Sequence, residues 1–428
     1  MKIYTRPVPS EWPTILARPT QSFSEIEPIV KEVFAAVGED GDTALLDYTQ
    51  KFDGAKLDSL AVTTDELKDA HTQVPAELKA AIAKAKSNIE AFHAAQRTKT
   101  IAVETMPGVA CWQEKRPIQK VGLYIPGGTA PLFSTILMLA IPARIAGCQE
   151  IVMCSPPDSN GNISPVILYT AQLCGVTKIF KAGGIQAIAG MTLGTETIPK
   201  VYKLFGPGNQ YVTVAKQYAT TLGVAIDMPA GPSELLVVAD ASANAAFVAS
   251  DLLSQAEHGV DSQVVLVSTS QAFLKEVEKE LALQLPALPR KEIAAKAIEN
   301  SRLIYVEDDE TALAIINEYG PEHYIVCVEN EDFYVQNTMN AGSVFIGNFT
   351  PESAGDYASG TNHTLPTNGY AKQYSGVNLD SFMKSMTFQK ISEQGLQNLG
   401  PAVELMAEAE GLQAHKNAVT LRLNAMKQ

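Results

Sequence analysis

The sequence contains no long basic run, and acidic residues outnumber basic ones: 47 Asp and Glu against 33 Lys and Arg, a net charge of −14. Nucleic acids and anionic membranes attract positive surfaces, so this balance argues against both as partners. Cysteine is scarce, with five residues in 428 and no C-x-x-C pair. An odd number of scattered cysteines is typical of reduced thiols, so we expect a cytoplasmic protein.

The sequence also lacks a segment suited to a membrane or to export. Its first residues, MKIYTRPVPSEWPTI, have no apolar core, so no signal peptide is expected. The longest apolar stretch, PLFSTILMLAIPARIAG, is interrupted by Ser134, Thr135 and Pro142 and predicts a buried helix rather than a membrane span. With 46% hydrophobic residues, the chain is long enough for two or three domains.

Hydrophobic periodicity divides the chain into helical and mixed segments. Residues 24–95 follow a helical pattern, clearest in PAELKAAIAKAKSNIEAFHAAQ, where Pro75 suits a first turn. Three later segments each run strand, glycine loop, helix: VGLYIPGGTAPLFSTILMLAIPARIAG, TKIFKAGGIQAIAGMTLG and VYKLFGPGNQYVTVAKQYA. This order predicts a parallel sheet covered by helices. Further strands are expected in SELLVVAD, SQVVLVST, LIYVED, HYIVCV and AGSVFIGN, and helix again from about Ser375. We therefore expect two α/β domains with helical pieces at both ends.

The glycine loops are candidate nucleotide sites, because backbone N–H groups in such loops face a bound phosphate. The loop GPGNQY begins like the dinucleotide fingerprint but has Tyr211 where Gly or Ala is expected. Any one loop is better explained as a tight turn between packed elements. Three loops in neighbouring units favour a shared ligand at the carboxyl ends of the strands.

Four of the six histidines lie in polar segments: His258 in SQAEHG, His323 in GPEHY, His363 in GDYASGTNHTLPT and His415 in EGLQAH. The same segments carry four carboxylates, Glu257, Glu322, Asp356 and Glu410. Imidazoles and carboxylates together suit a zinc-type metal with general bases beside it. No H-E-x-x-H motif occurs, so the spacing alone does not establish a zinc site. His258 either binds a metal or only stabilises the C-terminal end of its helix. His71 and His93 lie among Ala and Lys and are expected to be surface or hydrogen-bonded helix residues.

Seven segments, in order along nearly the whole chain, resemble the histidinol dehydrogenase family: GLYIPGGTAPLFST, GPGNQYV, DMPAGPSE, LLSQAEHGVDSQ, GPEHY, AGSVFIGNFTPESAGDYASGTNHTLPT and EGLQAH. The resemblance implies oxidation of L-histidinol to L-histidine through an aldehyde, with NAD as oxidant, as the last step of histidine biosynthesis. It also implies one Zn²⁺ per subunit, a homodimer, and two incomplete Rossmann-like domains with parallel sheets and small helical terminal segments.

The resemblance also implies roles for individual residues. The catalytic pair would be Glu322 and His323. The zinc ligands would be Gln255, His258, Asp356 and His415. Substrate contacts would come from Ser233, Gln255, His258, His323, Asp356, His363, Glu410 and His415. NAD would contact Tyr124, Gln186 and Asn209, one residue in each glycine loop.

Four segments follow from the resemblance. They are an N-terminal extension (1–22), a zinc and substrate domain (23–120 with 235–375), an NAD-binding domain (121–234) and a C-terminal helical segment (376–428). In the implied homodimer the C-terminal helices reach over the partner, so His415 would serve the neighbouring subunit's site.

Other classes of protein remain open from the residues alone. A zinc hydrolase could use the same glutamate, histidine and metal set, but it would not explain polar residues in three glycine loops. A non-catalytic nucleotide-binding module would not need Glu322 and His323. A cysteine nucleophile, Cys111 or Cys148, is disfavoured because neither has a neighbouring His or Lys to lower its pKa.

Overall fold

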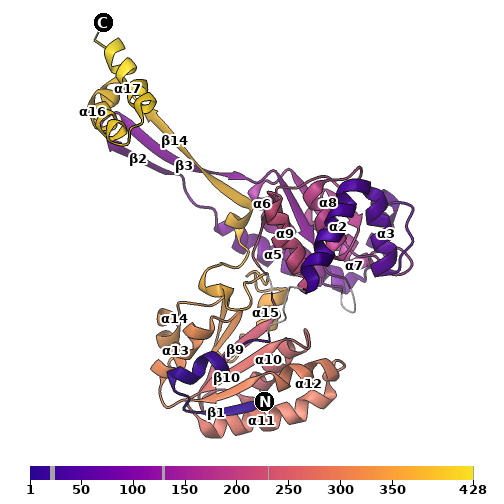
Figure 1. Ribbon diagram of the computed structural model, residues 1–428. Helices are drawn as coiled ribbons and strands as arrows, with labels where there is room; N and C mark the ends of the chain where they lie inside the picture. Colours follow the sequence, from indigo (N-terminus) through magenta and orange to yellow (C-terminus); the bar gives the residue numbers. More distant parts are fainter. Residues whose placement is uncertain (20–24, 128–130, 230, 428) are drawn as a thin grey trace. The chain divides into compact units, whose positions relative to one another are not determined.

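The computed structural model describes residues 1–19, 25–127, 131–229 and 231–427, which form two compact units (Figure 1). The first unit comprises Met1–Gln96 and Ile118–Phe382, and the second comprises Arg97–Pro117 and Met383–Gln428. Among the described residues, no helix combines the length and the apolar character needed to cross a membrane.

A parallel sheet of six strands forms one core of the first unit. Its order is β1 (Lys2–Thr5), β11 (Arg302–Tyr305), β10 (Gln263–Ser268), β9 (Glu234–Ala239), β12 (His323–Cys327) and β13 (Ser343–Ile346). The central strands β9 and β10 are buried at every position, as expected of strands covered on both faces. The strands predicted from SELLVVAD, SQVVLVST, LIYVED, HYIVCV and AGSVFIGN are thus confirmed.

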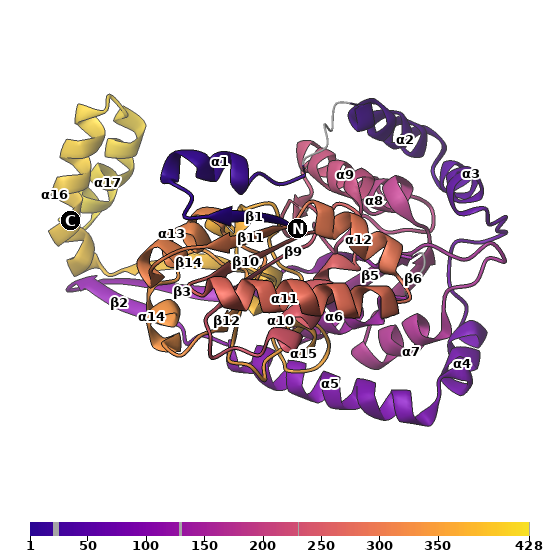
Figure 2. The same cartoon turned by 90° about the horizontal axis from the view of Figure 1, so that it is seen from below.

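Helices cover both faces of this sheet because alternate strand residues point to opposite sides. Leu235 and Val237 pack with α10 (Ala245–Ala256) and α11 (Gln271–Gln284), which lie side by side in Figure 2. Leu236 and Val238 pack on the other side with α13 (Asp309–Tyr319) and residues of α1 (Trp12–Ile15) and α14 (Glu331–Asn337). This region also contains α12 (Lys291–Glu299) and α15 (Glu352–Tyr357), and short 3₁₀ turns lie at Pro9–Glu11, Leu285–Ala287, Tyr370–Lys372 and Leu379–Phe382.

A second parallel sheet in the same unit has five strands. Its order is β6 (Lys178–Lys181), β5 (Glu150–Ser155), β4 (Lys120–Tyr124), β7 (Lys203–Phe205) and β8 (Ala225–Ile226). The connecting helices are α6 (Phe133–Ala146), α7 (Pro165–Cys174), α8 (Gly184–Leu193) and α9 (Gln210–Thr221). The predicted strand, glycine loop, helix units are confirmed, and α6 is the expected buried apolar helix. The strand order reverses at β4, which places a topological switch point between β4 and β7.

The N-terminal helices pack on the helices that cover the five-stranded sheet. The N-terminal helices are α2 (Ile26–Asp40), α3 (Asp42–Asp53), α4 (Thr64–Gln73) and α5 (Ala76–Ala95). Val30 and Phe34 of α2 share a core with Tyr124 and Val152 of this sheet. The expected grouping of residues 23–120 with 235–375 stays a prediction. Residues of the expected extension 1–22 contribute β1 and α1 to the six-stranded sheet.

The second unit is an antiparallel sheet with two helices. Strand β3 (Val109–Pro117) pairs with β2 (Ile101–Met106) and with β14 (Met383–Ile391), and the chain ends in α16 (Glu393–Ala409) and α17 (Gln413–Ala425). Trp112 and Phe388 stack across the β3–β14 pair, with ring centroids 5.3 Å apart. The expectation of helix alone from Ser375 onward is therefore wrong for β14. Its sequence, MKSMTFQKI, is mostly polar and exposed, and it becomes a strand by pairing with distant β3.

Candidate active site

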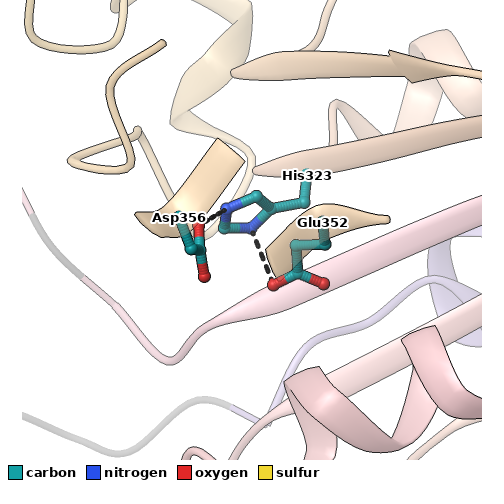
Figure 3. A group of neighbouring side chains, drawn as sticks. All are labelled: His323, Glu352 and Asp356. Carbon is teal, nitrogen blue, oxygen red and sulfur yellow. Dashed lines mark ion pairs between the residues drawn. The ribbon is translucent and has the colours of Figure 1, made fainter. Parts of the chain in front are cut away.

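A buried imidazole lies among carboxylates at the start of β12 (Figure 3). His323 is the first residue of this strand, and its Nε2 atom is 3.3 Å from Asp356 Oδ1. Its Nδ1 atom is 3.8 Å from Glu352 Oε1. Glu352 and Asp356 are four residues apart on α15 (Glu352–Tyr357), so both project from one face of that helix. His323 is 3% and Glu352 is 1% exposed, so water screens this cluster weakly.

The predicted catalytic partner Glu322 lies against the same ring. Its Oε2 atom is 3.7 Å from His323 Nδ1 and accepts the backbone N–H of Glu234 at 2.9 Å. Glu234 begins β9, so the neighbouring strand orients the Glu322 carboxylate. Arg18 in turn contacts Glu234 through an ion pair of 2.5 Å and lies over the ring of Tyr319. The cluster therefore gathers at the amino ends of β9 and β12, although ligands of open sheets usually bind at carboxyl ends.

The charges in the cluster shift the pKa of its members. Burial by itself lowers the pKa of His323, but the carboxylates of Glu352 and Glu322 and the contact with Asp356 raise it well above its usual value. Burial raises the pKa of Glu352 to about 8, an increase that His323 partly offsets. Burial also opposes ionisation of Asp356, yet His323 and the neighbouring histidines hold the pKa of that carboxyl below its usual range. Three carboxyl groups thus surround one imidazole, an arrangement that favours binding of a cation.

The residues of the cluster fit a divalent metal ion. Ligand atoms of His323, Glu352 and Asp356 all lie within 4.8 Å of one another. Within the described part of the chain, both ring nitrogens of His323 and Oδ1 of Asp356 are buried without a hydrogen-bond partner. Buried polar atoms that lack partners are rare and commonly mark the place of an ion or ligand. Nitrogen and carboxylate donors are those that zinc prefers.

Two predicted metal ligands come from the end of α10. Gln255 is fully buried. In the orientation of its amide that forms hydrogen bonds, Nε2 donates to the Glu352 carboxylate and lies 3.3 Å from Oε2. This orientation turns the carbonyl oxygen of Gln255 away from Glu352, as a metal ligand would require. His258 follows the helix, has an exposed side chain, and favours ionisation of Asp356.

The predicted substrate residues of the first unit border the same region. His363 Nδ1 lies 2.8 Å from the backbone oxygen of Asp356, and its Nε2 lies 3.2 Å from Thr135 Oγ1. Burial lowers the pKa of His363, so its ring favours the neutral form. Ser233 immediately precedes β9, and its carbonyl accepts the N–H of Gln263.

Two further predicted residues lie in the second unit. Glu410 follows α16 and His415 lies in the first turn of α17, and both side chains are exposed. Their roles as substrate contact and zinc ligand stay predictions. Glu352 was not predicted at all, and the only signal for it was its spacing of four residues before Asp356.

The remaining histidines and the candidate nucleophilic cysteines have ordinary surroundings. His71 is exposed, and buried His93 is hydrogen-bonded to the carbonyl of Ile89, as expected of helix residues. Burial raises the pKa of the Cys148 thiol to about 12, which opposes thiolate formation. Cys111 lies in β3 of the second unit.

A cavity of about 770 Å³ opens at the carboxyl ends of the five-stranded sheet. Tyr124, Gln186 and Asn209, the predicted NAD contacts, all line it. Tyr124 ends β4, and its hydroxyl accepts the N–H of Gly184 at 3.1 Å. Asn209 caps α9 by accepting the N–H groups of Tyr211 and Val212. Helix N-termini and glycine loops at a topological switch point suit a dinucleotide.

Two parallel sheets, a cavity at the switch point and a buried imidazole–carboxylate cluster define an α/β enzyme with a candidate metal centre. The family model for histidinol dehydrogenase matches residues 16–423. The chain belongs to the histidinol dehydrogenase family.

Individual relatives cover the whole chain. The histidinol dehydrogenases of Bacteroides thetaiotaomicron and Bacteroides fragilis are 60% and 58% identical to it over 427 residues, which is 100% of each chain. The crystal structure of histidinol dehydrogenase from Elizabethkingia anophelis superposes with a TM-score of 0.98 at 56% identity. That match covers 100% of this chain and 99% of the other.

Proposed function

We propose that the chain oxidises L-histidinol to L-histidine through L-histidinaldehyde, with two NAD reduced in succession and one Zn²⁺ bound per subunit. Membership of the histidinol dehydrogenase family makes the chain an oxidoreductase of histidine biosynthesis. The observation that carries the chemistry is the buried His323, held between the carboxylates of Glu322, Glu352 and Asp356.

His323 acts as the general base in both oxidations. An alcohol has a pKa near that of water, roughly 16, and a histidine has one of about 6.5. A complete proton transfer before oxidation would cost about 13 kcal/mol, so His323 takes the proton as the hydride leaves. NAD, when bound, accepts that hydride. The surrounding carboxylates strengthen His323 as a base, because they raise the pKa of its ring.

Glu322 activates the water that the aldehyde stage requires. The aldehyde must become a hydrate before it can lose a second hydride. The Glu322 carboxylate is buried, oriented by the N–H of Glu234, and close to His323. A carboxylate in this position can orient and deprotonate water while His323 serves the carbon-bound hydroxyl.

Gln255, His258, Asp356 and the partner subunit's His415 hold the zinc ion in this proposal. Zinc, when bound, supplies a positive charge that fixes the imidazole and amine of the substrate. Glu352 supports Gln255 by accepting its amide N–H, which is the usual duty of a residue behind a metal ligand.

A homodimer accounts for the place of His415 and Glu410 on the second unit. The helices α16 and α17 expose Leu405, Met406 and Leu421, at 68%, 66% and 61%. On two helices that pack together, exposed apolar side chains of this size are expected to be covered by a partner. We expect α16 and α17 of the partner subunit to bring His415 and Glu410 to the active site.

An assay of NADH formation with L-histidinol tests this function. Purified enzyme is incubated with L-histidinol and excess NAD, NADH is followed by absorbance, and histidine is quantified by chromatography. The proposal predicts two NADH for each L-histidine. A zinc hydrolase would form no NADH and would show no saturable change in NADH fluorescence on titration, and either result would reject the proposal.

A further inference from the structure

The cavity beside Tyr124 holds a carboxylate that the proposed NAD contacts leave without a role. Asp53 is the last residue of α3, which Gly54 ends with a left-handed φ of 71°. A carboxylate at the C-terminal end of a helix faces the negative end of the helix dipole. Asp53 is also half-buried, and burial raises its pKa to about 6. The helix dipole and burial both make a charged Asp53 unfavourable for the stability of the fold, which suggests that its side chain binds a ligand.

Gln186 joins Asp53 in the wall of the cavity. Its Nε2 atom donates to Asp53 Oδ2 at 3.2 Å, which fixes the orientation of the amide. The carbonyl oxygen of Gln186 is then buried without a hydrogen-bond partner among the described residues, and the side chain has no exposed surface. A buried acceptor without a donor costs free energy, so a ligand that brings a hydroxyl donor would relieve it. Carboxylate and amide together offer two neighbouring acceptors, which is the complement of a vicinal diol.

The position of Asp53 in the fold selects one part of a dinucleotide. In this topology the pyrophosphate lies at the first strand, here β4, and the adenosine ribose lies toward the second strand, here β5. Pro156 follows β5 and lies against Gly183, the residue that caps α8. Asp53 approaches the same glycine, because a Cβ atom there would be only 3.1 Å from Asp53 Oδ1. The acceptor pair is therefore on the side of the cavity where the adenosine ribose binds.

The charges around the acceptor pair disfavour a phosphate. None of the described residues that line the cavity is Lys or Arg. Lys51, two residues before Asp53, holds its ammonium over the rings of Tyr48 and Phe52. Asp158, which follows β5 where dinucleotide folds usually place their ribose acid, uses Oδ1 to accept two N–H groups of its own turn.

We propose that Asp53 and Gln186 accept hydrogen bonds from the 2′- and 3′-hydroxyls of the adenosine ribose, and that Asp53 selects NAD against NADP. A 2′-phosphate would face the Asp53 carboxylate, and none of the described residues lining the cavity supplies a cation to neutralise it. The inference rests on the proposed NAD-dependent function. It assigns to the N-terminal helices the specificity that other dinucleotide folds place at the end of their second strand.

Three substitutions test the assignment. Asp53→Asn removes the charge at constant shape, Asp47→Asn makes the same change at an exposed position of the same helix, and Asp158→Asn tests the alternative acid. For each, kcat/KM is measured with NAD, NADP and 2′-deoxy-NAD, and NADH and NADPH affinities are measured by fluorescence titration. A hydrogen bond to a charged group contributes about 10- to 100-fold in affinity. Asp53→Asn should therefore lower kcat/KM for NAD by that factor. The ratio of kcat/KM for NAD to that for NADP should fall by a similar factor.

Removal of the 2′-hydroxyl gives a sharper comparison. The wild type and Asp47→Asn should lose at least tenfold with 2′-deoxy-NAD, whereas Asp53→Asn should lose little. Thermal melts check the fold, and Asp53→Ser repeats the test with a smaller side chain. The inference is overturned if Asp53→Asn keeps the wild-type preference, if Asp158→Asn shifts it equally, or if the wild type binds NADPH as tightly as NADH. Wild-type enzyme that prefers NADH in titrations but forms none from L-histidinol would reject the proposed function alone.

Discussion

Replacement of Glu322 by Gln should separate the two oxidation steps. Glu322 is 6% exposed, its Oε2 atom accepts the N–H of Glu234, and it lies 3.7 Å from His323. The glutamine carbonyl can accept the same N–H, so the packing should survive. Loss of a water-activating base costs about 10²- to 10⁴-fold, and only the aldehyde stage needs that water. The rate of the first oxidation should fall by no more than about tenfold. A small decrease is expected because the neutral amide replaces the Glu322 charge, which raises the pKa of His323.

A single-turnover experiment with excess NAD measures both steps. Enzyme in excess over L-histidinol is mixed rapidly, and NADH is followed by absorbance. The wild type should form two equivalents without a resolved pause, and Glu322→Gln should form one fast equivalent followed by a slow one. Glu329→Gln, the same change at an exposed residue two positions after β12, is the matched control and should behave like the wild type.

Equal slowing of both equivalents in Glu322→Gln would refute a dedicated role in water activation. Glu322 would then orient His323 or maintain its basicity in both steps. His323→Asn gives the reference for that outcome, because loss of the shared base should slow the first and second equivalents alike.

Three further predictions concern the metal, the dimer and a buried acid. His258→Asn should lose zinc and activity while the fold survives, and full zinc content after dialysis would contradict the ligand assignment. Refolding His258→Asn chains together with His415→Asn chains should restore part of the activity, since one site of a mixed dimer then has all its ligands. No recovery of activity despite demonstrated mixing would indicate a site built within one chain. Asp251 is buried, and burial raises its pKa to about 7. Between about pH 4 and pH 7 the folded protein therefore holds one proton more than the unfolded chain, so its stability falls as the pH rises through that window. In chelator-treated protein, Asp251→Asn should flatten this decline and gain up to about 4 kcal/mol above pH 7, and urea unfolding with an unchanged pH slope would contradict this.

Local patterns were sufficient to predict the architecture of the first unit. A strand followed by a glycine loop and a helix is a local signal, and it recurs in three units of the five-stranded sheet. Parallel strands bring their carboxyl ends to one edge, so Tyr124, Gln186 and Asn209 line the same cavity although they are far apart in sequence. Glu322 precedes β12 as expected, whereas His323 is the first residue of that strand.

Contacts between distant segments were not predictable in the same way. The apolar face of α2 shows that the helix packs, but it does not show on which of two sheets. Strand β14 is recognisable only through its pairing with β3, as in the register of Gln389 with Cys111. Glu352 carries no motif, and its role beside His323 follows from the turn of α15 that also positions Asp356. Asp53 is the last residue of a helix and reaches the cavity only because α3 packs on α8.

NADH formation from L-histidinol before and after removal of the metal tests the central claim most directly. The protein is assayed as purified, after chelation and dialysis with metal analysis, and after zinc is returned. We predict two NADH per L-histidine, loss of turnover in the metal-free protein with NADH binding retained, and recovery with zinc. NADH binding should persist because the residues of the cavity and those of the imidazole–carboxylate cluster are separate sets. Undiminished turnover in protein shown to be free of metal, or no NADH from L-histidinol at any stage, would contradict this prediction.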